Sequence, residues 1–293
     1  MKTCFLAISM AAVLASPALA QSPEETEPSG AEAEADSLQA IAEAFEALTL
    51  SADPAEAARE ENRAPREWAD ITPEHIEALA SRARSLQARL NGLEDQSSPE
   101  WKILSHLLSG YIAEAEFDTA RMPFNGDWGF QAEPLFAARQ VRIGNEDDAE
   151  AWIARINDIP RYFDDNITNM RRGIATGWTA HKDPLATTTA QIREQAGIDP
   201  EESGLYAPLK TLPDSIDPET QDALRASGKQ AAERAVAAYD KALAFMEETY
   251  APEARPDAGI VNLPGGKAYY KAAIENHTAG AGYTPEEIHA LGE

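Results

Sequence analysis

The sequence is poor in the residues that most often hold metal ions. It contains one cysteine, Cys4, and five histidines in 293 residues. A single cysteine cannot close a disulfide within the chain, and no two histidines lie three or four positions apart, as they would in an H-E-x-x-H helix. The residue types and spacings of a common zinc site are therefore missing. We expect no metal ligands and no bound cofactor in this chain.

Basic residues are also scarce. The chain has 25 Lys and Arg residues against 50 Asp and Glu residues, which gives a formal net charge of -25 at pH 7. A field of this sign repels nucleic acid and anionic lipid, so we expect neither as a partner. Long apolar runs are missing too. After the first twenty residues, nothing approaches the roughly 20 apolar residues of a membrane-spanning helix.

The first twenty residues are typical of a secretory signal peptide. Lys2 provides the positive end, residues 5–14 form an apolar run too short to span a bilayer, and Ala18-Leu19-Ala20 fits the small-x-small cleavage rule. We expect cleavage after Ala20 and a periplasmic or secreted location. Lipidation is not expected, because Cys4 precedes the apolar run that a lipoprotein cysteine would have to follow. Cleavage also removes this only cysteine.

The mature chain is expected to begin with an acidic leader. Residues 21–36 contain six acids, two prolines and no basic residue. Such a segment cannot bury enough apolar surface to become ordered, so we predict that it is disordered. The rest of the chain, residues 37–293, is predicted to be one helical domain.

Apolar residues after the leader follow the period of an α-helix. They recur at steps of three and four, most clearly in the series Val236, Tyr239, Leu243, Met246 and Tyr250. Strict two-residue alternation is nearly absent, so strands are a minor element at most. We predict an all-α fold, a multi-helix array or bundle whose helices pack through apolar stripes.

Prolines and capping residues mark several helix ends. Thr72-Pro73 and Ser98-Pro99 each combine a capping side chain with a proline at the first helical position. Either Asp147 or Asp148 is expected to cap a later helix. Residues 197–217 contain three prolines and two glycines without a clear period, and we predict a loop there.

Residues 117–130 differ in composition from the segments around them. They hold four aromatic residues, one proline and two glycines between amphipathic helices. A turn so rich in apolar rings is expected to pack against helices rather than extend into water. Two interpretations are open. The segment is either a buried Ω-like connection, with Arg121 paired to Asp118 or Asp127, or the wall of a cleft.

The glycine pair in Leu263-Pro-Gly-Gly-Lys267 invites comparison with a phosphate-binding loop. No predicted strand precedes it, and Ala268 stands where Ser or Thr would bind magnesium, so we reject that interpretation. The pair either starts a helix or points free N–H groups at an anion such as a carboxylate. The helix that follows would place Tyr270, Ile274 and His277 on one face. A Ser-His-Asp triad needs no proximity in sequence and stays open, although no G-x-S-x-G motif is present.

Several motifs in a fixed order resemble bacterial proteins of domain of unknown function family 885. The resemblance runs from about Trp101 to the end of the chain. It rests on the motifs Phe117-Asp-x-x-Arg121-x-Pro123, Asp127-x-Gly129-Phe130, Pro160-Arg-Tyr-Phe163, Asn169-Met170-Arg-x-Gly173, Gly177-Trp-Thr179, Ser203-Gly-x-Tyr206-x-Pro208, Pro264-Gly-Gly-x-x-Tyr269-Tyr270 and Thr284-Pro-Glu-Glu-Ile-His289-x-Leu-Gly292.

The resemblance implies a largely helical, exported protein that is regarded as a candidate zinc metallopeptidase. Members of that family are roughly twice as long, and their zinc-binding H-E-x-x-P-G-H pattern is absent from this sequence. No metal ligand or catalytic residue is therefore carried over, and zinc is expected only in the full-length family architecture. The matching positions supply candidate pocket-wall residues, namely Arg121, Asp127, Trp128, Tyr269 and Tyr270.

The last residues bear on how much of the family architecture this chain contains. Thr284 and Glu287 form a capping box and Pro285 follows the cap, yet the chain ends within two turns, at Glu293. A helix this short is marginal without tertiary support, so we interpret it as an interrupted one. The fold is then expected to be the N-terminal part of a larger helical fold.

Two functional hypotheses follow. The first is an exported N-terminal fragment of a metallopeptidase-like protein, without catalytic activity on its own, whose partners are a peptide-like substrate or the C-terminal half. The alternative is a helical periplasmic binding or interaction module that lacks the catalytic half.

Overall fold

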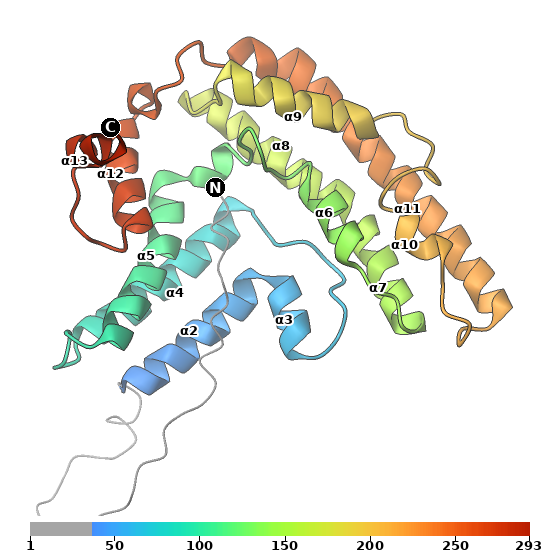
Figure 1. Ribbon diagram of the computed structural model, residues 1–293, viewed down its shortest axis with the longest axis horizontal. Helices are drawn as coiled ribbons and strands as arrows, with labels where there is room; N and C mark the ends of the chain where they lie inside the picture. The colour runs from blue at the N-terminus through green and yellow to red at the C-terminus, as the bar shows by residue number, and fades with distance from the viewer. Residues whose placement is uncertain (1–36) are drawn as a thin grey trace, which may run out of the picture.

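The computed structural model describes residues 37–293, and the signal peptide and acidic leader expected before them lie outside the described residues. Within that range the regular structure is helical apart from two isolated bridges, which confirms the all-α prediction. Figure 1 shows the helices forming an arch. Their bounds are α2 (Leu38–Ala52), α3 (Pro54–Glu60), α4 (Pro73–Asn91), α5 (Pro99–Phe117), α6 (Glu133–Gln140), α7 (Glu146–Asn157), α8 (Ile159–Thr176), α9 (Lys182–Gln195), α10 (Ala207–Lys210), α11 (Pro218–Phe245), α12 (Gly266–His277) and α13 (Pro285–Gly292).

Helices α2, α4 and α5 pack together at one side of the arch (Figure 1). Their apolar stripes meet in a core of their own, with Ile41, Leu90 and Leu108 fully buried. The two expected helix starts are confirmed. The hydroxyl of Thr72 accepts the His75 N–H at 3.3 Å, and the hydroxyl of Ser98 accepts the Trp101 N–H at 3.2 Å.

The other side of the arch is organised around α11, which packs against α7, α8 and α9. Small buried side chains let these helices approach closely, and five alanines of α11 contribute: Ala231, Ala232, Ala235, Ala238 and Ala242. Buried aromatic rings fill the space between the helices. Phe163 of α8 meets Tyr239 of α11 edge to face, with ring centroids 4.7 Å apart.

One local prediction on this side was wrong, and another needs an addition. Asn145, not Asp147 or Asp148, caps α7, because its backbone is extended and its side-chain oxygen accepts the Asp148 N–H at 3.0 Å. Both aspartates lie inside the first turn, where their charge favours the helix dipole. Residues 197–217 are irregular as predicted except for the four-residue helix α10, whose Leu209 is fully buried against α11.

A strap of residues 61–72 connects α3 to α4 and joins the two sides of the arch. Its anchor is Trp68, which is 2% exposed. The Trp68 backbone N–H donates to Asp158 at 2.8 Å, and its indole N–H donates to the carbonyl of Arg155 at 2.8 Å. Arg161 donates back to the Trp68 carbonyl at 2.8 Å. Three hydrogen bonds thus fix the strap across the junction of α7 and α8.

Helix α12 attaches through Trp178, which follows α8. The indole N–H of Trp178 donates to the Pro264 carbonyl at 2.7 Å, and its ring meets Tyr269 at 5.4 Å. Tyr270, Ile274 and His277 were predicted to share one face of α12, and of these three Ile274 is buried whereas Tyr270 and His277 are exposed. The turn before α12 is tight: a Cβ at Gly266 would lie 1.9 Å from the Ile260 carbonyl oxygen. Tyr269, rather than Tyr270, packs against the body, where its ring meets Phe117 and Trp178.

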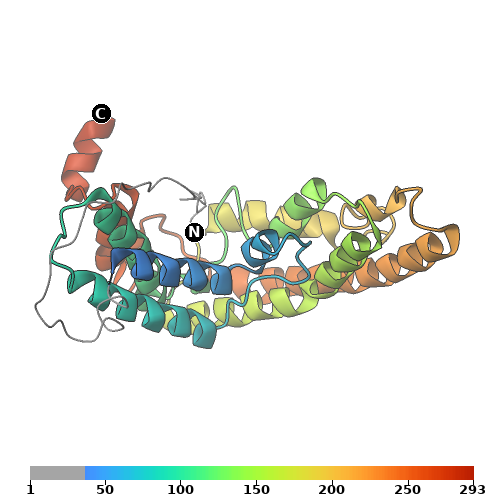
Figure 2. The same ribbon diagram turned by 90° about the horizontal axis from the view of Figure 1, so that it is seen from below.

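Helix α13 has the predicted capping box of Thr284 and Glu287, with Pro285 at its first position. None of its residues is buried. Figure 2 shows the C-terminal helix standing away from the rest of the molecule. Of the helices in residues 37–293, none has the length and apolar character needed to cross a membrane.

Candidate functional site

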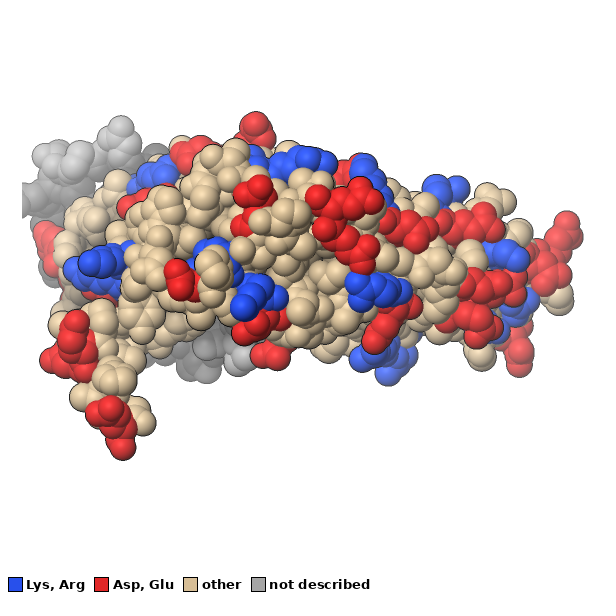
Figure 3. All heavy atoms as spheres, turned by 90° about the horizontal axis from the view of Figure 1, so that it is seen from above, with Lys and Arg blue, Asp and Glu red and all other residues tan. Residues whose placement is uncertain are grey.

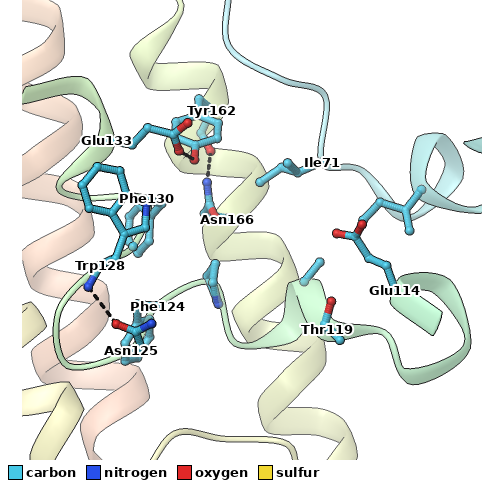
Figure 4. Close-up of a pocket in the computed structure, with 14 residues that line it drawn as sticks. Ile71, Glu114, Thr119, Phe124, Asn125, Trp128, Phe130, Glu133, Tyr162 and Asn166 are labelled. Carbon is cyan, nitrogen blue, oxygen red and sulfur yellow. Dashed lines mark hydrogen bonds between the residues drawn. The ribbon is translucent and has the colours of Figure 1, made fainter. Parts of the chain in front are cut away.

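A cavity of about 70 Å³ lies where the strap, α5, α8 and residues 117–130 meet. Figure 4 shows the side chains that converge on it. Residues 117–130 supply most of the apolar wall, and the strap and the start of α4 add two isoleucines. The main lining side chains are Ile71, Ile76, Glu114, Thr119, Phe124, Asn125, Trp128, Phe130, Glu133, Tyr162 and Asn166.

The aromatic wall depends on a tight turn. The side-chain oxygen of Asn125 accepts the backbone N–H groups of Asp127 at 2.8 Å and Trp128 at 2.7 Å. The chain then returns so that Phe124 faces Gly129 across an antiparallel bridge. A Cβ at Gly129 would lie 2.5 Å from the Phe124 Cβ, so only glycine fits at this position.

The rings carried by the turn do not all have the same environment. Phe124 and Phe130 are 8% and 2% exposed, and they pack edge to face on Tyr250 and Phe163 of the core. Trp128 is half-buried and meets Phe136 of α6, with ring centroids 5.0 Å apart. The turn is thus both packed on the core and part of a cleft wall, which combines the two interpretations of residues 117–130.

Three polar side chains form the back of the cavity. The Tyr162 hydroxyl donates to a Glu133 carboxylate oxygen at 2.6 Å, and the Asn166 amide donates to the Tyr162 carbonyl at 2.7 Å. Burial raises the pKa of Tyr162 well above its ordinary value, and the neighbouring charge of Glu133 adds to the effect. Tyr162 therefore keeps its proton at neutral pH and orients the carboxylate.

The charged side chains of the lining are carboxylates, from Glu114 of α5 and Glu133 of α6. A site of this kind favours ligands that carry donors or positive charge. Within residues 37–293, no three His, Cys, Asp or Glu side chains come together as a metal site would require. The site as described can bind and orient a ligand group.

The five predicted pocket-wall residues lie in two places. Trp128 lines the cavity, whereas Arg121, Asp127, Tyr269 and Tyr270 are not among its lining residues. Asp127 and Tyr270 are exposed. Arg121 pairs with Asp118, one of its two expected partners, at 3.2 Å. The guanidinium of Arg121 and the ring of Tyr269 both pack on the ring of Trp178, where α12 joins the body.

Sequence reasoning missed the polar half of the cavity. Glu114 is one of three exposed acidic residues of α5, and Glu133 is the single acidic residue of α6, in its first turn, so nothing in their local pattern marks them. For Tyr162 and Asn166 the sequence offers a weak indication of a shared site. They are four positions apart beside the apolar stripe of α8 and therefore lie on one face of the helix. Ile71 reaches the cavity only through the path of the strap, which no local sequence pattern predicts.

The fold and the cavity define an all-α protein with a small cavity lined by aromatic rings and two carboxylates. Residues 54–293 match the family described as "Bacterial protein of unknown function (DUF885)", and the chain belongs to this family. None of the curated proteins matches it.

A solved structure with a similar fold is that of a "putative lipoprotein" from Colwellia psychrerythraea. The two chains are 17% identical, with a TM-score of 0.69. The similarity covers 87% of this chain and 47% of that one, so this chain spans about half the length of its structural relative. At this level of identity the likeness establishes the shared fold.

Proposed function

We propose that this chain is the N-terminal helical part of an exported metallopeptidase-like protein, and that this part binds a peptide-like substrate without performing the chemistry. The observation that carries the proposal is the cavity between the strap, α8 and residues 117–130. Membership of the family and the similarity to half of a longer chain support the architectural part. The sequence motifs described above support the link to metallopeptidases.

The size of the cavity favours a ligand that inserts one group. Sites for whole drug-sized ligands or cofactors usually enclose about 300–1,000 Å³. A cavity of about 70 Å³ accommodates a single side chain or chain terminus, while the rest of the ligand lies on the surface. A peptide has this form. The aromatic wall supplies apolar contact, and the carboxylates and the Asn166 amide supply orientation.

The experiment is a binding titration of the purified mature chain with a library of fluorescent peptides, followed by anisotropy. We expect a subset of peptides to bind, and Trp128→Ala to weaken that binding about 10-fold or more, because a half-buried tryptophan at a binding site is a typical hot spot. The matched control is Ile103→Ala, since Ile103 lies on α5, is 48% exposed and does not line the cavity. Equal binding by Trp128→Ala, or no binding at all, would overturn the proposal.

The proposal that this chain binds substrate without performing the chemistry also makes a prediction about zinc. Because the sequence lacks the H-E-x-x-P-G-H pattern, we expect the purified chain to retain no stoichiometric zinc after dialysis and to show no metal-dependent peptide cleavage. Elemental analysis and a cleavage assay measure this. One tightly held zinc ion per chain would contradict it and point to a site built from dispersed histidines and carboxylates.

A second candidate is a helical periplasmic interaction module that acts without a catalytic half. The observation that favours it is the exposed C-terminal end, where Tyr283, just before α13, and Leu291 of α13 are 42% and 70% exposed and available to a partner. The nucleotide sequence downstream separates the two candidates. An adjacent reading frame with H-E-x-x-P-G-H favours the first, in which the C-terminal half is the partner, and an intergenic region without it favours the second.

A further inference from the structure

The turn that carries the aromatic wall contains the pair Asn125-Gly126. In an Asn-Gly sequence the next backbone nitrogen attacks the side-chain amide most readily, because glycine has no Cβ to shield that nitrogen. The chain has a second such pair, Asn91-Gly92, at the end of α4. The two pairs share a sequence and differ in their surroundings, so the fold decides which of them reacts.

The fold leaves Asn125-Gly126 open to this reaction. Asn125 is exposed, and a Cβ at Gly126 would meet nothing within 4 Å. Within residues 37–293, the Gly126 N–H has no hydrogen-bond partner. No carbonyl therefore competes for the proton that this nitrogen loses when it acts as a nucleophile.

The side chain of Asn125 is turned toward the backbone that follows it. Its oxygen accepts the N–H groups of Asp127 at 2.8 Å and Trp128 at 2.7 Å, and Figure 4 shows the second bond. Because both donors come after Gly126, the side-chain carbonyl folds over the Asn125–Gly126 peptide bond. The same donors stabilise the negative charge that develops on this oxygen when its carbon is attacked, as an oxyanion hole does.

The surroundings of Asn91-Gly92 have the opposite effect. The Gly92 N–H donates to the carbonyls of Ala88 at 3.2 Å and Arg89 at 3.0 Å, in the last turn of α4. The side-chain oxygen of Asn91 accepts the Gln87 amide at 2.9 Å, one turn back along the helix. The nitrogen keeps its proton and the side chain is held away from it, so this pair is protected.

From this contrast we infer that Asn125 is a site of spontaneous chemical modification that alters the aromatic wall. The Gly126 nitrogen gives its proton to solvent and forms a bond to the side-chain carbonyl carbon of Asn125. The bond from that carbon to the amide nitrogen breaks, and the nitrogen takes up a proton and leaves as ammonia. Water then opens the resulting succinimide to aspartate or isoaspartate. The net reaction consumes water and releases ammonia, without an oxidant or reductant.

The two products differ in their effect on the turn. Aspartate keeps the backbone length and an oxygen that accepts the same N–H groups, whereas isoaspartate adds one atom to the main chain. The Asn125 N–H now donates to the Trp128 carbonyl at 2.8 Å. The Phe130 N–H donates to the Pro123 carbonyl at 3.2 Å. A longer chain cannot keep both bonds, so we expect isoaspartate to displace Trp128 from the cavity wall.

The charge that both products add is the smaller change. The formal net charge is already -25, and acidic side chains are spread along the face seen in Figure 3, with fewer basic ones among them. Salt screens exposed charges over about 10 Å at roughly 0.1 M. The effect on the wall should therefore follow the amount of isoaspartate rather than the total conversion.

The test ages the purified mature chain at neutral and mildly alkaline pH in water enriched in heavy oxygen. The incorporated oxygen marks conversion that occurs during the incubation. Peptide mapping by mass spectrometry measures this conversion at each asparagine, and electron-transfer fragmentation separates isoaspartate from aspartate. We expect Asn125 to react at least about 10-fold faster than Asn91, since a barrier difference of about 1.4 kcal/mol gives that ratio.

Three matched variants complete the test. Gly126→Ala shields the attacking nitrogen with a methyl group that meets nothing within 4 Å, so it should slow conversion of Asn125 by on the order of 10-fold and leave Asn91 unchanged. Asn125→Asp has the added charge with an unmodified backbone. Ageing should shift the tryptophan fluorescence of the native chain. The shift should be absent from Asn125→Asp and from aged Trp128→Phe.

An Asn125 that stays intact, or reacts no faster than Asn91, overturns the inference. Equal rates in the native chain and in Gly126→Ala overturn the succinimide route. Isoaspartate at position 125 with unchanged tryptophan fluorescence overturns the effect on the wall. None of these outcomes depends on the ligand of the cavity, so the proposed function stands or falls separately, by the peptide titration.

Discussion

At the scale of single residues, Trp68 holds the two sides of the arch together. Its ring stacks on Tyr162 with centroids 5.6 Å apart, and the Arg155 guanidinium lies 3.9 Å from its centroid. Because Tyr162 lines the cavity, the same contact also supports the back of the candidate site. A single buried side chain therefore links the strap, the α7–α8 junction and the cleft.

We expect Trp68→Ala to lower the free energy of unfolding by about 3–5 kcal/mol, the usual cost of truncating a buried tryptophan. Urea denaturation followed by circular dichroism measures the change. Ile103→Ala serves as the control, because Ile103 is 48% exposed and its loss should stay within about 0.5 kcal/mol. If Trp68→Ala is as stable as the control, the strap is not fixed by this anchor.

Asp70, in the same strap, should make the free energy of unfolding depend on pH in the acidic range. Burial alone would raise the pKa of Asp70, but the Thr72 hydroxyl and N–H, at 2.7 and 2.8 Å, together with His75 and Arg161, lower it below its ordinary value of 3.8. Near that pH the unfolded chain binds more protons than the folded chain, so stability falls as the pH drops through this region.

The measurement is the urea midpoint between pH 7 and pH 3 for the native chain and for Asp70→Asn. At pH 7 the urea midpoint of Asp70→Asn should be lower than that of the native chain. On acidification this midpoint should fall by less, because the amide does not titrate. Asp222→Asn is the comparison, since that carboxylate side chain is 81% exposed. Parallel curves for the native chain and Asp70→Asn would refute the assignment.

At the scale of elements, residues 117–130 position the aromatic wall through backbone geometry. The segment offers a matched pair of glycines. A Cβ at Gly129 would lie 2.5 Å from the Phe124 Cβ and 2.9 Å from its Cα, whereas a Cβ at Gly126 would meet nothing within 4 Å. The two glycines are three residues apart in one turn. Comparing their alanine variants therefore separates the cost of a steric clash at Gly129 from the effect that any glycine-to-alanine change has on the backbone.

Gly129→Ala should destabilise the protein by about 1–3 kcal/mol, because the added methyl group forces the turn apart. Gly126→Ala should change stability by less than about 0.5 kcal/mol. Thermal unfolding of both variants provides the stabilities, and Trp fluorescence reports displacement of Trp128. Equal effects at the two positions would mean that the turn is looser than its contacts indicate.

At the scale of the whole molecule, stability should decline toward the C-terminal end. Helix α11 has 28 residues and is surrounded by α7, α8 and α9. Helix α12 buries only Gly266 and Ile274, and the 8 residues of α13 include no buried one. Protection from hydrogen exchange follows burial and hydrogen-bond shielding, so the three helices should differ.

We expect amides of α11 to exchange most slowly, those of α12 at intermediate rates, and those of α13 nearly as fast as in an unstructured peptide, because a helix this short is marginal alone. Hydrogen exchange read by mass spectrometry resolves these segments. Size-exclusion chromatography in parallel controls for self-association. Slow exchange in α13 of a monomer would show that this helix has a packing surface within the chain.

The sequence by itself determined the class of the fold and much of its local structure. The steps of three and four predicted helices throughout, and Thr72, Ser98 and the Thr284–Glu287 capping box were located correctly. These features could be predicted because helical periodicity and caps depend on residues within about four positions of each other. Even the nearby Asn145 cap was missed, since three acidic residues beside it compete as candidates.

The tertiary structure alone decided the composition of the cleft and the face that each terminal element presents. Ile71, Glu114 and Tyr162 converge on one cavity from the strap, α5 and α8, far apart in sequence. Tyr269 rather than Tyr270 packs against the body, because its ring meets Phe117 and Trp178 from distant parts of the chain. Such outcomes depend on close packing and burial between distant segments, for which local periodicity carries no information.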